Sequence, residues 1–260
     1  MTQSLLVPPG SSVDLTKRDP ASTPGAPGSR SETEAVFAQQ HERLFALQDR
    51  WTAEGKRGLL VVLQGIDTSG KDGTIRHVFG GLSPSSTRVA SFVEPTPIEA
   101  AHDFLWRVHA QTPKAGEITI FNRSHYEDVL VARVHELVPA HVWRGRYAHI
   151  NAFEALLGDA GTTVVKFMLH ISRDEQEQRF TQRLSDPTKL WKFKESDRVE
   201  SRFWDEYQKA FTEMLEKTST GYAPWHVVPS DHKWYRNWAV TEILVDVLDK
   251  LNPKYPEASG

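Results

Sequence analysis

The sequence has no cysteine, no long apolar run and no excess of basic residues among its 260 positions. Without cysteine, the chain can form no disulfide bond, no thiolate metal site and no cysteine nucleophile. No apolar run approaches the roughly 20 residues that a membrane-spanning helix needs, and the N-terminus lacks the basic-then-apolar pattern of a signal peptide. The formal net charge of −3 gives no global positive field for nucleic acid, so a polyanion has to be bound by a local cluster. We therefore expect a soluble, cytoplasmic protein that binds neither nucleic acid nor a membrane.

Proline, glycine, serine and threonine dominate residues 1–30, which contain the stretches VPPGSS and PASTPGAPGS. Such a composition buries little apolar surface, so it predicts a flexible N-terminal tail that is disordered or draped over the surface. Order is expected from Ser31, because Ser31 and Glu34 have the spacing of a capping box for a helix that runs to about Glu54. Residues 31–260 are predicted to form a single domain.

Short apolar runs alternate with helical patterns along the rest of the chain. The predicted strands are 58–65, 87–94, 116–122, 162–172 and 225–230. One predicted helix begins near residue 71, and the others span 97–111, 126–137, 141–161, 173–184, 199–218 and 234–251. Alternating strands and helices favour right-handed βαβ units and a mostly parallel sheet. The pattern predicts an α/β fold of three layers, α/β/α, with a helical lid at about residues 180–200.

A phosphate-binding loop is indicated by GIDTSGK, residues 65–71, which fits the pattern GxxxxGK between a strand and a helix. Backbone N–H groups of a loop that turns into a helix converge on one point, and the helix dipole adds partial positive charge there. Glycines let an anion approach the backbone closely, and the lysine supplies a point charge. The alternative is a glycine-rich turn without a ligand. The predicted phosphate-binding residues of the loop are Gly65, Thr68, Ser69, Gly70 and Lys71.

Two carboxylates, Asp67 and Asp72, stand in or beside this loop, where they would repel phosphate. Asp72 occupies the position at which such loops usually carry serine or threonine. A divalent cation between Asp67 and the phosphate oxygens would remove the repulsion, so we assign Asp67 to Mg²⁺. Asp72 either supports that ion from outside its ligand shell or favours the helix start through the dipole, and we prefer the second role.

The third predicted strand ends at Asn122, the first of a group of polar residues, NRSHYED, that extends to Asp128. Ligands of doubly wound sheets bind beyond the carboxyl ends of the strands, so Arg123 is expected beside the phosphate loop. Its planar guanidinium can hold a phosphoryl group in transfer. The alternative is a structural salt bridge from Arg123 to Glu127 or Asp128.

The segment after the fourth predicted strand is basic. A mobile cationic segment at this place suits a lid that excludes water and neutralises phosphate charge. The alternative is a solvated charged helix, because acidic residues partly balance the cations. We assign function to Arg183, Lys192 and Lys194. The basic residues of the segment are Arg173, Arg179, Arg183, Lys189, Lys192 and Lys194.

Together these residues resemble the type-2 polyphosphate kinase family. The matching stretches are LQGIDTSGKDGTI, HDFLWRVH, FNRSHYEDVLVARVHELVP, DPTKLWKF and APWHVVPSDHKWYRNW, and the resemblance extends from about residue 35 to residue 253. It implies a thymidylate-kinase-like P-loop kinase fold with a helical lid. It also implies Mg²⁺-assisted transfer of phosphate between inorganic polyphosphate and adenine or guanine nucleotides, by a homo-dimer or homo-tetramer.

The resemblance also implies roles for single residues. Asp67 and Lys71 become catalytic residues of the loop, Arg123 acts at the strand end, and Arg183 reaches in from the lid. Asp197 corresponds to a second acid that binds metal or fixes the lid.

One departure from the commonest family pattern concerns the acceptor. Most members read FDRS where this chain reads FNRS, so Asn122 removes one candidate metal ligand. The stretch FNRSHYEDV resembles the subgroup that phosphorylates both nucleoside monophosphates and diphosphates. This implies AMP and ADP as acceptors, with Asn122 and Glu127 as determinants of nucleotide selection.

Two other functions share the same loop. One is an ATP-dependent nucleoside or nucleotide kinase, and the other is a non-catalytic P-loop module that binds nucleotides. A switch of the second kind normally needs serine or threonine after the lysine, which Asp72 replaces. The physiological direction of transfer is left open by the sequence.

Overall fold

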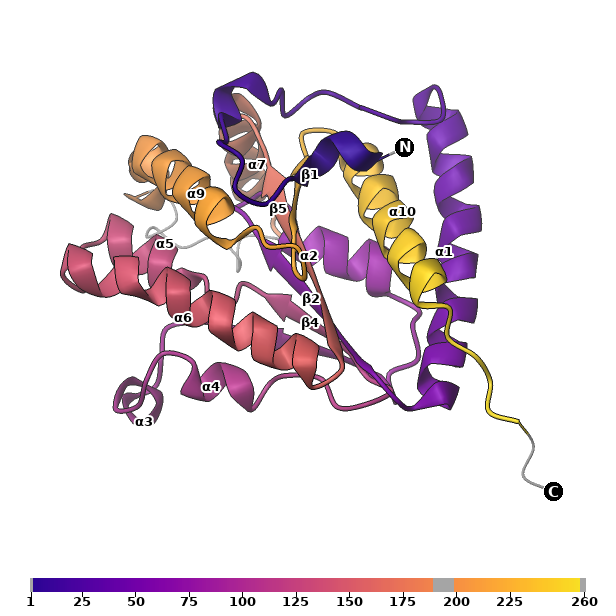
Figure 1. Cartoon of the computed structure of the whole chain (residues 1–260). Helices are drawn as coiled ribbons and strands as arrows, with labels where there is room; N and C mark the ends of the chain where they lie inside the picture. Colours follow the sequence, from indigo (N-terminus) through magenta and orange to yellow (C-terminus); the bar gives the residue numbers. More distant parts are fainter. Residues whose placement is uncertain (1, 189–198, 258–260) are drawn as a thin grey trace.

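A six-stranded sheet forms the centre of the protein (Figure 1). The computed structural model describes residues 2–188 and 199–257. The strand order is β1-β6-β5-β2-β4-β3, with every neighbouring pair parallel except β1 and β6. The strands are β1 (Leu6–Val7), β2 (Gly58–Gln64), β3 (Thr87–Ser91), β4 (Ile118–Asn122), β5 (Thr162–His170) and β6 (Trp225–Pro229). The five strands predicted from apolar runs are thus all present.

Strand β2 shows how the sequence separates two helical layers. Leu59, Val61 and Leu63 belong to an apolar cluster with residues of α1 and α10, whereas Leu60 and Val62 belong to a cluster with residues of α6 and α9. Successive side chains of a strand point to opposite faces, so a strand covered on both faces is apolar throughout. The predicted three-layer α/β/α fold is confirmed. The covering helices are α1 (Arg30–Glu54), α6 (Ala140–Asp159), α9 (Trp204–Thr218) and α10 (Lys233–Leu251).

Two predicted helix boundaries are wrong. Helix α1 starts earlier than expected, because Ser29 and Glu32, rather than Ser31 and Glu34, form its capping box. The single helix predicted over 97–111 is two short turns, α3 (Pro97–Ala100) and α4 (Trp106–His109). The Asp103 carboxylate accepts a hydrogen bond from the Leu105 N–H at 2.9 Å, a local bond that competes with continued helix.

The N-terminal segment lies against the sheet and the helices. Its described part includes a 3₁₀ turn (Thr2–Leu5), strand β1 and a second 3₁₀ turn (Leu15–Lys17). Leu6 pairs with His226 at the edge of β6. Of the two alternatives for residues 1–30, these contacts correspond to the draped one, because four widely spaced apolar residues supply buried surface: Leu5, Val7, Val13 and Leu15. The division of the chain into a tail and one domain stays a prediction.

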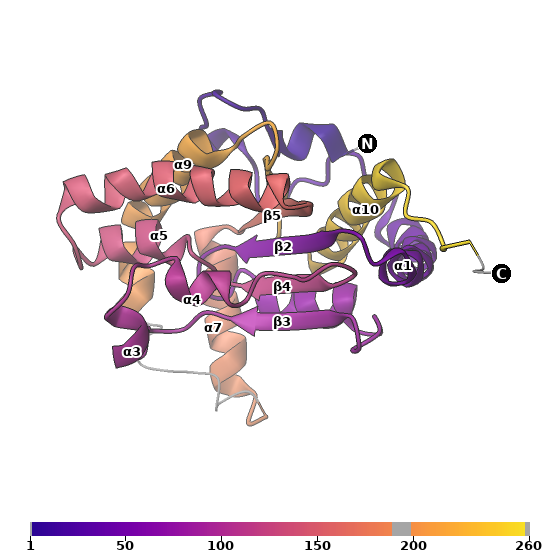
Figure 2. The same ribbon diagram turned by 60° about the horizontal axis from the view of Figure 1, so that its bottom comes forward.

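The carboxyl ends of the parallel strands meet at one edge of the sheet, and Figure 2 shows β2, β4 and β3 pointing toward it. Helix α2 (Lys71–Thr74) starts there after β2 and continues as a π-helical turn (Ile75–Phe79). Helix α5 (Glu127–Val134) follows β4, and α7 (Arg173–Ser185) follows β5. Within the described ranges, no helix is both long enough and apolar enough to cross a bilayer.

Candidate active site

Two glycines give the loop between β2 and α2 its shape. Gly65 has φ +150°, and a Cβ added to it would lie 2.7 Å from the backbone oxygen of Leu169. Gly70 has φ +107° and caps α2, and a Cβ added there would lie 2.0 Å from Nη1 of Arg236. Only glycine tolerates such backbone angles and such close approach. The loop has the compact form expected of a phosphate-binding loop.

Polar groups of the loop are buried inside it. The Lys71 ammonium donates hydrogen bonds to the backbone oxygens of Gly65 at 2.6 Å and Ile66 at 3.2 Å. The hydroxyls of Thr68 and Ser69 are buried and have no hydrogen-bond partner within residues 2–188 and 199–257. Unpartnered buried hydroxyls are costly, so they mark a place where a ligand would restore hydrogen bonds. All five residues predicted to bind phosphate in the loop therefore lie together.

Asp67 and Arg123 form an ion pair across the site, with Arg123 Nη2 2.7 Å from Asp67 Oδ1. The pair excludes neither residue from ligand contact, because both side chains remain partly exposed. The sequence also allows a structural salt bridge from Arg123 to Glu127 or Asp128. Asp128 Oδ1 lies 3.2 Å from Arg146 instead. Glu127 does act on Arg123 electrostatically, because burial alone would lower the pKa of Arg123, but Glu127 and Asp67 raise that pKa. Arg123 has φ +60°, and left-handed conformations of residues other than glycine occur preferentially at functional sites.

The charges around the loop control each other's ionisation. Burial alone would raise the pKa of Asp67, but Lys71, Arg123 and Arg183 hold that pKa below its ordinary value. Burial lowers the pKa of Lys71, and Asp67 opposes this effect. Burial raises the pKa of Glu127, against the influence of Arg123 and Lys71. The site is an arrangement of cations in which Asp67 stays ionised.

The two residues assigned to nucleotide selection lie at the same edge of the sheet. Asn122 Nδ2 donates a hydrogen bond to Asp72 Oδ1 at 3.0 Å, so it holds the carboxylate next to the loop lysine. Glu127 begins α5 and contributes to the electrostatics of Lys71 and Arg123. Asp72 is the second residue of α2, where its charge suits the helix start.

Only part of the predicted lid can be placed. Arg183 lies in the last turn of α7, close enough to the loop to lower the pKa of Asp67. Lys192, Lys194 and Asp197 lie outside the described residues, as do all the residues 189–198 of the segment 180–200 predicted as the lid.

A Mg²⁺ ion fits the donor set of this site. The described part of the chain contains no group of three or more histidine or acidic side chains that could hold a metal. Magnesium does not require one, because it commonly binds one or two carboxylates and completes its shell with water and substrate phosphates. Asp67, ionised and partly exposed beside the loop, can supply such a carboxylate.

Three further residues at the loop were not assigned from the sequence. Gln176 and Arg179 of α7 donate hydrogen bonds to loop carbonyls. Arg236 of α10 is buried against Gly70 and Gly73, and burial together with Arg179 lowers the pKa of Arg236 to about 9. The sequence held only weak signals for the two arginines: Arg179 belongs to the predicted basic segment, and Arg236 belongs to the stretch WYRNW.

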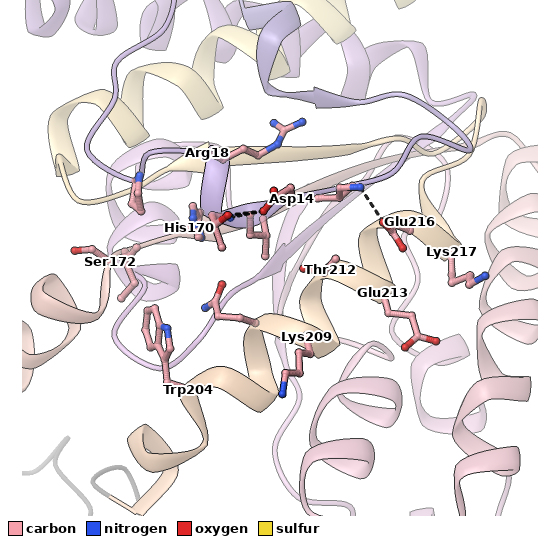
Figure 3. A pocket seen from close by; sticks show the side chains of 16 residues that line it. Asp14, Arg18, His170, Ser172, Trp204, Lys209, Thr212, Glu213, Glu216 and Lys217 are labelled. Atoms are coloured by element: carbon pink, nitrogen blue, oxygen red, sulfur yellow. Dashed lines mark hydrogen bonds between the residues drawn. The ribbon is translucent and has the colours of Figure 1, made fainter.

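A cavity of about 640 Å³ lies between the N-terminal segment and α9 (Figure 3). The backbone N–H of Val13 donates a hydrogen bond to Glu216 at its rim. Among the residues that the structure describes, none of those assigned to phosphate, metal or nucleotide lines it. Its walls include Val13, Arg18, His170, Ser172, Trp204 and Glu216.

The sheet is mostly parallel, and a loop shaped by glycines leads from one of its strands into a helix. A lysine, an arginine and a carboxylate surround that loop. These features define the class of P-loop phosphotransferases. Residues 28–256 match the family Polyphosphate kinase 2 (PPK2). The chain belongs to this family, as the sequence resemblance predicted.

Relatives of known sequence and structure agree with this assignment. The chain is 51% identical over 251 residues to an AMP/ADP-polyphosphate phosphotransferase of Meiothermus ruber, across 96% of this chain and 94% of that protein. It is 38% identical over 274 residues to an ADP-polyphosphate phosphotransferase of Rhodopseudomonas palustris, across 99% and 93%. The crystal structure of polyphosphate kinase 2 from Arthrobacter aurescens TC1 is similar with a TM-score of 0.96 at 45% identity, across 99% of this chain and 92% of that chain.

Proposed function

We propose that this protein transfers the terminal phosphoryl group of inorganic polyphosphate to AMP and ADP, and catalyses the reverse reaction. The observation that carries the proposal is the phosphate-binding loop with Lys71 inside it and the Asp67–Arg123 pair across it. The acceptors follow from the similarity over nearly the whole chain to a relative named AMP/ADP-polyphosphate phosphotransferase. We also propose that the protein acts in the cytoplasm as a homo-dimer or homo-tetramer. Light scattering of the purified protein tests this oligomeric state.

In the proposed reaction, an oxygen of the acceptor's terminal phosphate attacks the last phosphorus of the polyphosphate chain. A new P–O bond forms, the bridging P–O bond breaks, and the shortened polyphosphate leaves with the bonding electrons. The attacking oxygen is already ionised, so no strong general base is needed. No histidine or serine has to carry the phosphoryl group.

The residues of the site align the phosphates and neutralise their charge. Phosphate oxygens over the loop accept hydrogen bonds from its backbone amides and from the hydroxyls of Thr68 and Ser69. The Lys71 ammonium exchanges its hydrogen bonds to the loop carbonyls for bonds to the ligand. Arg123 and Arg183 offset the charge that spreads over the transferred group. Asp67 would hold Mg²⁺, which supplies Lewis-acid polarisation and charge neutralisation when bound. Asn122 and Glu127 are assigned to acceptor selection.

Initial rates with separate donors test this function. Polyphosphate with AMP or ADP and Mg²⁺ should yield ADP or ATP, whereas ATP as sole donor to nucleosides should give little product. Arg123→Ala and Arg183→Ala should each lose about a hundredfold or more in kcat, which corresponds to roughly 3 kcal/mol. Arg173→Ala, an exposed cation on the same helix as Arg183, is the control. Rates of the two variants within threefold of the parent would contradict these roles, and transfer from ATP alone would favour an ordinary nucleotide kinase.

A further inference from the structure

Helix α7 holds three successive carbonyl groups of the phosphate-binding loop. Gln176 Nε2 donates to the Asp67 oxygen at 3.1 Å. Arg179 Nη1 donates to the Thr68 oxygen at 2.8 Å and to the Ser69 oxygen at 3.0 Å. The two side chains stand three residues apart, on one face of the helix, and both are almost fully buried, with 2% and 6% exposure.

All five N–H groups of Arg179 have partners. Besides the two loop carbonyls, Nε donates to Glu175 Oε1 at 2.6 Å. Nη2 donates to the backbone oxygens of Ser230 at 2.6 Å and Asp231 at 3.2 Å. The planar fork therefore joins the loop to the segment that connects β6 with α10. A lysine ammonium, with three donors on a flexible stem, cannot reproduce this pattern.

These bonds determine where the loop amides point. In a trans peptide the N–H and C=O groups point in opposite directions. Holding the Asp67 and Ser69 carbonyls on the α7 side therefore turns the N–H groups of Thr68 and Gly70 to the other side. The turn needs such support because Thr68 has φ +67°, a conformation that residues other than glycine rarely adopt.

We propose that Gln176 and Arg179 are positioning residues that hold the loop amides in the orientation that receives phosphate. They act on the substrate through the loop backbone, without touching it. The proposal rests on the proposed function, since it takes the loop to be the place where the phosphate chain binds. Helix α7 would then connect the phosphate-binding loop with Arg183, which lies four residues beyond Arg179 on the same helix.

The test compares Arg179→Lys, Arg179→Met and Gln176→Met. Calorimetric titration with tripolyphosphate should show at least a tenfold loss of affinity for both Arg179 variants and a two- to fivefold loss for Gln176→Met. Hydrogen exchange of the loop amides in the ligand-free protein should be faster in all three variants. KM for AMP and ADP should stay within twofold of the parent. Arg173→Met and Gln182→Met, exposed residues of the same helix, serve as matched controls.

Rescue by the conservative variant separates geometry from charge. If Arg179→Lys binds tripolyphosphate within twofold of the parent, or if loop exchange is unchanged in Gln176→Met, the positioning role is wrong. Gln176→Met loses a single hydrogen bond, so it keeps the test decisive if the Arg179 variants fail to fold. Lys71→Met distinguishes the two proposals. Unchanged tripolyphosphate binding in Lys71→Met would refute the loop as the phosphate site, whereas loop exchange in the free protein reports on Gln176 and Arg179 in either case.

Discussion

At the scale of single residues, the phosphate loop depends on two glycines, because its surroundings leave no room for a Cβ atom at either position. Gly70 leaves room for the Arg236 guanidinium, and Gly65 leaves room for the backbone of β5. Two buried arginines, Arg179 and Arg236, thus pack behind the loop, and they make its surroundings positive before any substrate binds.

We expect Gly70→Ala to disable the loop. The added methyl group would lie 2.0 Å from Arg236 Nη1, and φ +107° strains any other residue. Tripolyphosphate affinity should fall at least tenfold in calorimetry, and the melting temperature should fall as well. The control is Gly145→Ala within α6, where an added Cβ meets nothing within 4 Å. That change should be neutral or stabilise the helix by up to about 1 kcal/mol. Parent-like affinity in Gly70→Ala would show that the guanidinium moves aside freely.

At the scale of elements, a buried ionic network joins the helices that cover β5. Lys166 on β5 donates to Glu154 Oε2 of α6 at 2.6 Å, to Tyr126 Oη at 2.9 Å and to the backbone oxygen of Thr218 at the end of α9 at 2.7 Å. Tyr126 precedes α5, so the network fixes α5, which starts with Glu127, relative to the sheet. Burial would raise the pKa of Glu154, but Lys166 keeps that pKa below its ordinary value.

Removing one member of this network should be costly. Lys166→Met leaves the Glu154 carboxylate buried without its counter-ion, so we expect a loss of about 3–5 kcal/mol in the free energy of unfolding, measured with urea. Lys250→Met is the matched control. Its ammonium also lies 2.6 Å from a carboxylate, Asp246, but both side chains are largely exposed, and such pairs contribute about 1 kcal/mol or less. Equal losses in the two variants would mean that burial does not decide the strength of the pair.

The elements were predicted well where their signal is local. Apolar runs located β2 to β6, and the strand–loop–helix pattern located the phosphate loop. The break at Asp103 was missed because the side chain of one residue outweighs the helical preference of its neighbours. The contacts of Arg179 could not be predicted, since its partners Thr68 and Asp231 lie more than fifty residues away on either side and meet it only in the folded chain.

At the scale of the whole molecule, the N-terminal segment adds strand β1 to the sheet and is hydrogen-bonded to α9 through Val13 and Glu216. Its composition suggested a tail because proline, glycine and serine separate its few apolar residues. Those residues are nevertheless buried, and hydrogen bonds hold the segment at intervals. The Asp231 N–H donates to the Pro20 oxygen at 3.2 Å, and the Tyr235 hydroxyl donates to the Pro24 oxygen at 2.8 Å.

Leu15→Ala tests how much this segment stabilises the protein. Leu15 is 5% exposed, so its truncation should lower the free energy of unfolding by about 2–5 kcal/mol. Leu156→Ala, the same change at a side chain 54% exposed on α6, should alter it by no more than about 0.5 kcal/mol. Urea unfolding followed by tryptophan fluorescence measures both. A value for Leu15→Ala as small as that of the control would show that the segment contributes nothing to global stability.

The pairing of Leu6 with His226 also has a consequence for biosynthesis. Leu6 and Val7 are synthesised more than two hundred residues before their partners in β6. Until β6 has been made, the two residues of β1 have no strand partner. If β1 were missing, the outer edge of β6 would be unpaired, and an unpaired edge can associate with another chain. A truncated polypeptide that lacks residues 1–7 would therefore be prone to edge-to-edge association through β6, even with its phosphate-binding loop intact.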